Sequence, residues 1–165
     1  MGPPTSGNEH SRSSLRVVCF AYVRSVFQYA IIFWGNSMHA HQAFKLQKRV
    51  VMVMSDVGPR SSCRSLFRNI NILPTACQYI LSLMLIIVDN QKHFLANAYV
   101  HGLDTRNKNH LYLPLVHLCS KRCFILWGQS FNSLASNVQS YRNDRKRFKD
   151  KLCRYLIIHS FYSVT

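Results

Sequence analysis

An apolar run of ten residues, "YILSLMLIIV" at positions 79–88, sets the strongest limit on how this chain can fold. A helix that spans a membrane needs about 20 such residues, so a run of this length predicts a buried helix instead. The run lies within residues 75–94, "TACQYILSLMLIIVDNQKHF", whose middle is apolar on nearly every side of a helix. Pro74 suits the start of this helix, because its missing N–H is not needed in the first turn. We therefore expect a central helix here.

Hydrophobic periodicity predicts further helices before the central one. Residues 14–37 carry apolar side chains at helical spacing and close at Gly35 and Asn36, which both tolerate the left-handed conformation. Ser37 can then cap a helix over residues 38–57. The apolar side predicted for that helix consists of Ala43, Leu46, Val50, Val53 and Met54. A short helix over residues 61–70 is expected to follow.

The remainder of the chain alternates polar and basic segments. Residues 138–162 read as a helix with a dense basic surface, and their apolar stripe consists of Tyr141, Phe148, Leu152, Tyr155 and Leu156. Between the central helix and this one, residues 124–127 fit either a strand or part of a helix. We predict a mainly α fold of four to five helices. Its parts are a flexible tail (residues 1–12), a helical region (13–100), and a polar connector with a basic helical region (101–165).

The charge balance restricts both the chemistry and the partners of the chain. Lysine and arginine number 21 against six acids, a formal net charge of +15, which calls for nucleic acid, anionic lipid or an acidic protein as a partner. Two-metal phosphoryl transfer and paired-acid glycoside chemistry both need converging carboxylates. The acids here are scattered instead: Glu9, Asp56, Asp89, Asp104, Asp144 and Asp150. Both chemistries are therefore disfavoured.

The candidate nucleic-acid-binding residues are lysines and arginines in four clusters. Two clusters lie in and around the helices predicted over residues 38–57 and 61–70, one in the connector "HGLDTRNKNHLYLP", and one in the last helix. In chain order they are Lys45, Lys48, Arg49, Arg60, Arg64, Arg68, Arg106, Lys108, Arg142, Arg145, Lys146, Arg147, Lys149, Lys151 and Arg154. Such side chains can displace counterions from phosphates. The same clusters also fit plain solvated helix faces and a structural connector.

Other kinds of site find little support. His110, His117, Cys119 and Cys123 could suit zinc, but the Cys-x-x-Cys turn that is usual for such modules is missing, so we predict no metal and no cofactor. The sequence has no Gly-x-Ser-x-Gly motif and no glycine-rich phosphate loop. The first residues lack an apolar signal-peptide core, so we expect reduced cysteines and a cytoplasmic or nuclear location.

Five stretches of the sequence, taken in order, are informative together: "YVRSVFQYAIIFWGNS", "AFKLQKRVVMVMSDVGPRSSCRSLFRNINILP", "QYILSLMLIIVDNQKHF", "HGLDTRNKNHLYLP" and "RFKDKLCRYLIIHSFYS". In this order they resemble the C-terminal part of reverse transcriptases from Jockey-type non-LTR retrotransposons (LINE elements) of animals. The resemblance covers nearly all of residues 15–165.

The resemblance implies a thumb-like region that grips a template–primer duplex and packs against a polymerase palm. In that family the catalytic aspartates, including the Ala-Asp-Asp motif, lie upstream of this region, and nothing here matches them. The chain is therefore expected to bind nucleic acid without catalysis of its own. Two alternatives remain open. One is an interaction piece that folds only against a polymerase core domain, and the other is a basic amphipathic protein at a membrane surface. An independent enzyme ranks below both of these.

Overall fold

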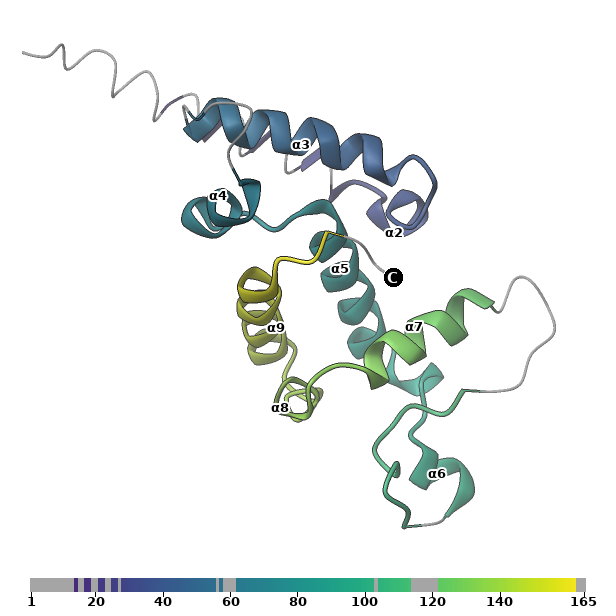
Figure 1. Ribbon diagram of the computed structural model, residues 1–165. Coiled ribbons are helices and arrows are strands. Elements are labelled where there is room, and N and C mark those ends of the chain that lie inside the picture. The colour runs from purple at the N-terminus through teal and green to yellow at the C-terminus, as the bar shows by residue number, and fades with distance from the viewer. Residues whose placement is uncertain are drawn as a thin grey trace, which may run out of the picture. The chain divides into compact units, whose positions relative to one another are not determined.

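The structure is a computed structural model that describes residues 14, 17–18, 21–22, 25–26, 28–55, 57, 62–102, 104–113 and 122–162. Figure 1 shows that this part of the chain is mainly helical, as the sequence predicts. Its only extended pairing is one isolated antiparallel bridge between Ala96 and Leu111. The helices are α2 (Ile31–Trp34), α3 (Ala40–Ser55), α4 (Cys63–Ile70), α5 (Thr75–Asp89), the 3-10 helix η1 (Gln91–His93), α6 (Asn97–His101), α7 (Arg122–Asn132), α8 (Ser136–Gln139) and α9 (Arg145–His159).

The chain divides into two compact units. The first unit comprises residues 1–79 and 156–165, and the second comprises residues 80–155. Helices α5 and α9 each contribute residues to both units. This division differs from the one expected from composition, because the last residues of the chain join the first unit. The tail expected over residues 1–12 lies outside the described residues.

Helix α5 is buried along most of its length, which confirms its expected role as the central helix. Cys77 and Met84 have no exposed surface, and Leu83 and Ile87 are almost as well covered. Its first residue, Thr75, follows Pro74, and the Gln47 side-chain oxygen accepts hydrogen bonds of 2.8 Å from both the N–H and the hydroxyl of Thr75. A side chain from α3 thus satisfies the N-terminus of α5, which would otherwise leave a buried donor unpaired.

Helices α3 and α4 pack against each other in the first unit (Figure 1). Their shared core contains Val51, Cys63 and Phe67, with Phe44 and Tyr162 at its edge. The rings of Phe44 and Tyr162 lie 4.9 Å apart, centre to centre. The segment that follows α9 therefore closes the core between α3 and α4.

The face of α3 that is buried differs from the predicted one. Leu46 and Val53 were expected inside, but they are 55% and 72% exposed. The buried residues of this helix are Gln47, Val51 and Met54. Met54 is buried as predicted. The prediction was wrong for Leu46 and Val53, because apolar residues occur on several sides of α3 and the sequence pattern does not select one of them.

The helix expected over residues 14–37 is interrupted at Ala30. This residue takes a left-handed conformation (φ 51°), and α2 begins directly after it. Gly35 ends α2 at an ordinary φ of −64°, so the left-handed role predicted for it is wrong. The glycine is needed for space instead, because a Cβ atom there would lie 2.4 Å from the ring of Tyr79.

Helix α7 settles the ambiguous region in favour of a helix, since residues 124–127 lie within it. In the second unit Phe131 of α7 stacks on Phe148 of α9 at a centroid distance of 6.2 Å, and both rings are buried. The connector is tied to α7 by Asn132, whose side chain accepts from the Leu111 N–H (2.7 Å) and donates to the Leu111 carbonyl (3.1 Å). Both backbone polar groups of the buried Leu111 are thus paired with one side chain of α7.

No single helix among the described residues is long and apolar enough to cross a membrane. By length and composition only the pair α4 and α5, bent by 50° at the break between them, would qualify together.

Candidate nucleic-acid interface

The predicted phosphate-binding residues fall into both units of the chain, so each group is described separately. Arg60 lies outside the described residues. The first unit holds the candidates of α3 and α4, which are Lys45, Lys48, Arg49, Arg64 and Arg68. The second unit holds the connector candidates and all those from Arg142 to Arg154.

The cations of the first unit are largely engaged with the protein itself. The ammonium of Lys48 lies 4.9 Å from the centre of the Phe44 ring, and the guanidinium of Arg64 lies 5.1 Å from that of Tyr162. Arg68 donates a hydrogen bond to the carbonyl of Ile158. The two α4 arginines therefore contact the last turn of α9 and the segment after it. Lys45 and Arg49 are the exposed cations of α3.

The connector contains two exposed cations, Arg106 and Lys108. Among the described residues, only Lys108 of these two has an ion pair. Arg106 is exposed in the turn over residues 106–109. Lys108 forms an ion pair of 2.8 Å with Asp104, and both side chains are well exposed to solvent. A pair of this kind contributes little to stability, so Lys108 could exchange Asp104 for another anion at low cost.

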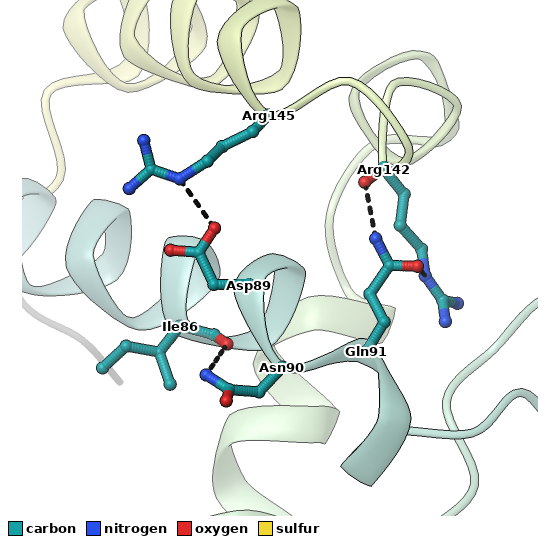
Figure 2. A network of polar contacts seen from close by, with 6 residues as sticks. All are labelled: Ile86, Asp89, Asn90, Gln91, Arg142 and Arg145. Atoms are coloured by element: carbon teal, nitrogen blue, oxygen red, sulfur yellow. Dashed lines mark hydrogen bonds and ion pairs between the residues drawn. The ribbon is translucent and has the colours of Figure 1, made fainter.

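Two of the predicted cations make polar contacts with the end of α5 and with η1: Arg145 at the start of α9 and Arg142 in the turn before it. Figure 2 shows Arg145 on Asp89, with Nε 2.6 Å from the carboxylate, and Arg142 on Gln91. Arg142 also donates to the Phe94 carbonyl at 3.3 Å. Burial lowers the pKa of Arg142, and the hydrogen bond to Asp89 raises the pKa of Arg145. Both arginines have structural contacts that a phosphate would have to replace.

The first turns of α9 concentrate positive charge that the acids of the described chain neutralise only in part. Asp144 caps the helix by accepting the N–H of Arg147 (3.1 Å) and pairs with the guanidinium of the same residue (3.2 Å). The first turn of α9 contains no acid. Lys146 and Lys149 are exposed, and no acid of the described chain pairs with either. Cations at a helix N-terminus oppose the helix dipole, so this arrangement costs stability and favours a bound anion.

A hollow of about 310 Å³ lies beside these cations in the second unit. It is lined by Tyr141, Arg147, Asp150, Lys151 and Arg154. The Lys151 ammonium lies 5.6 Å from the centre of the Tyr141 ring. The sequence pattern placed Tyr141 in the buried stripe of the last helix and did not mark it as a site residue. Tyr141 in fact lies before α9, in the turn that separates it from α8.

Metal binding and nucleophilic cysteine chemistry find no supporting geometry in the described residues. No group of three or more histidines, cysteines or acids there could hold a metal ion. His117 and Cys119, which the zinc alternative requires, lie outside the described residues. Burial raises the pKa of the Cys77 thiol to about 12, so this cysteine is not a nucleophile at neutral pH.

The structure thus leaves an exposed cationic surface on α9, defined by Lys146, Arg147, Lys149, Lys151 and Arg154, as the strongest of the four predicted clusters.

Comparisons with known proteins found no family model, no curated protein and no solved structure that matches the chain.

Proposed function

We propose that this chain binds nucleic acid without sequence preference, as a non-catalytic piece that corresponds to the C-terminal region of a non-LTR retrotransposon reverse transcriptase. The single observation that carries the proposal is the cationic surface of α9, with its exposed lysines that no acid of the described chain pairs with. The family origin rests on the five resembling stretches of sequence. The helical fold and the net charge of +15 are compatible with that origin.

The charge distribution of α9 suits binding of an anionic polymer better than a role as a plain solvated face. A solvated helix face ordinarily mixes charges of both signs, whereas α9 contains a single acid, Asp150, and begins with three cations at the end where the dipole already makes the potential positive. Phosphates would relieve this repulsion, and the release of condensed counterions would add to the affinity. A single small anion would gain much less, because it engages only one or two of the side chains.

Fluorescence anisotropy with a labelled duplex at several salt concentrations tests the proposal. The logarithm of affinity should fall with the logarithm of salt by about 0.9 for each phosphate engaged. Lys146→Gln combined with Lys149→Gln should make that slope shallower by roughly 0.9 for each phosphate that the variant no longer engages. Lys92→Gln, an exposed lysine on η1, is the control and should leave the slope unchanged. An affinity that does not depend on salt would reject the proposal.

A second candidate function is attachment to another protein, such as a polymerase core domain. It is favoured by a row of exposed apolar side chains near the start of the chain. Tyr22, Val26 and Tyr29 are separated by three or four residues and are 71%, 53% and 81% exposed. Phe33, in α2 beyond the break at Ala30, is 89% exposed. Soluble proteins seldom leave a row of this kind uncovered.

Sedimentation of the full chain tests this alternative. Replacing Tyr29 and Phe33 by serine should convert self-associating protein into a monomer, while salt-dependent binding of the duplex is retained. If the unmodified chain is already monomeric and fully soluble at high concentration, the row needs no partner and the alternative fails.

A further inference from the structure

The hollow beside α9 combines groups that a plain phosphate-binding surface does not need. Arg147, Lys151 and Arg154 supply three cations, Tyr141 supplies an aromatic ring, and Asp150 supplies a carboxylate. Arg147 and Asp150 are three positions apart, as are Lys151 and Arg154, and each member of the first pair is four positions from one member of the second. This spacing places the four residues on one side of the helix. Tyr141 comes from the preceding turn and also lines the hollow.

The carboxylate is the most informative member of this set. Within the described part of the chain, no cation lies at ion-pair distance from Asp150, although three cations line the same hollow. A carboxylate repels phosphate but accepts hydrogen bonds from hydroxyl and amino groups. A ligand that satisfies the whole hollow must therefore carry both an anion and hydrogen-bond donors.

We infer that the hollow binds one unpaired nucleotide of single-stranded nucleic acid. The Tyr141 ring stacks on the base, the three cations hold the flanking phosphates, and Asp150 accepts a hydrogen bond from a sugar hydroxyl or a base amino group. This inference rests on the proposed function and deepens it, because it names the form of nucleic acid that the same surface prefers.

The geometry separates a single strand from a duplex. In a duplex the faces of the bases are stacked on one another, so only phosphates and sugars could reach the hollow. In a single strand each base presents a face, and stacking on an aromatic side chain adds affinity with little regard for sequence. The volume of about 310 Å³ lies at the lower end of the range for small-molecule sites, which suits a single nucleotide.

Lys151 gives the hollow a defined response to its ligand. In the structure its ammonium lies over the Tyr141 ring, a favourable cation–π position. A stacked base would take that position, and the flexible lysine stem would let the ammonium move to a phosphate. The ring is thus covered in the unbound protein and available when a nucleotide enters.

Anisotropy measurements on the full chain, with a labelled single strand and a duplex of the same sequence, test the inference. Tyr141→Leu should weaken binding of the single strand about tenfold and that of the duplex less than about twofold, because stacking on the ring contributes only to single-strand binding. Tyr141→Phe retains the ring and should bind as the unmodified chain does. Tyr99→Leu removes an aromatic side chain that is 82% exposed and does not line the hollow, and it should have no effect.

Competition by small molecules provides a readout that needs no variant. Adenosine monophosphate should displace the labelled single strand at roughly one tenth of the concentration that ribose 5-phosphate requires, since only the former carries a base to stack. Asp150→Ala should improve competition by inorganic phosphate and impair competition by adenosine monophosphate.

The outcomes separate this inference from the proposed function. Equal losses for single strand and duplex in Tyr141→Leu, or equal competition by the two sugar phosphates, would overturn the nucleotide site while salt-dependent binding stands. If neither nucleic acid binds in a salt-dependent manner, the proposed function itself fails.

Discussion

Helix α9 buries a stripe of purely apolar side chains, whereas helix α3 places an amide at the centre of its buried face. Phe148, Leu152 and Leu156 of α9 are at most 1% exposed. Gln47 of α3 is 2% exposed, and its side chain bonds to Thr75 and to the Leu73 carbonyl. Helix α9 is therefore oriented mainly by burial of its apolar stripe, whereas hydrogen bonds from Gln47 to the start of α5 orient α3.

The sequences of the two helices explain why their orientations have different origins. In α9 the cations occupy all the sides of the helix outside the apolar stripe. Only that stripe can enter a core without burying charge. In α3 the run "VVMVM" at positions 50–54 makes several sides apolar. Burial of either side would gain similar hydrophobic free energy, so the contacts of Gln47 decide between them.

The largest expected effect comes from the apolar core of α9. Phe148→Ala should lower the free energy of unfolding by about 3–5 kcal/mol, because it removes a fully buried ring that stacks on Phe131. Val53→Ala, on the exposed apolar side of α3, should change it by less than about 0.5 kcal/mol. Urea denaturation monitored by circular dichroism measures both. A large loss for Val53→Ala would mean that the predicted face of α3 is the buried one.

An intermediate effect is expected where α3 caps α5. Gln47→Leu keeps the size of the side chain but leaves the buried N–H and hydroxyl of Thr75 without their acceptor, at a cost of about 2 kcal/mol. Gln42→Leu, an exposed position on the same helix, serves as the control and should be nearly neutral. Should Gln47→Leu stabilise the protein in the same denaturation experiment, hydrogen bonding would not be what orients α3.

The smallest effect concerns the charged start of α9. Lys146→Glu should raise the free energy of unfolding by about 0.5 kcal/mol, since an acid in the first turn interacts favourably with the helix dipole. The same substitution should weaken duplex binding. Lys92→Glu makes the same change in net charge on η1 and should give no such gain. If Lys146→Glu lowered stability, the cations of α9 would have to be structural rather than reserved for a ligand.

The candidate site was predictable only in part. The basic composition of the last helix identified the cationic surface of α9, and its exposed lysines lie where helical periodicity expects them. The pattern could not separate them from Arg142 and Arg145, which contact residues more than 45 positions earlier in the chain. The sequence pattern also did not identify Tyr141 as a site residue. Its place in the hollow depends on a break between α8 and α9 that the apolar spacing does not indicate.

By itself the sequence determined that the chain is helical, that α5 is central, and that the protein is strongly cationic. These properties follow from local periodicity and composition, which depend only on residues close together in the chain. The tertiary structure alone decided which side of α3 is buried and which cations remain exposed. Both outcomes depend on hydrogen bonds and ion pairs between distant residues, such as Gln47 with Thr75 and Asp89 with Arg145. Such contacts form only when folding brings the partners together, and no local pattern encodes them.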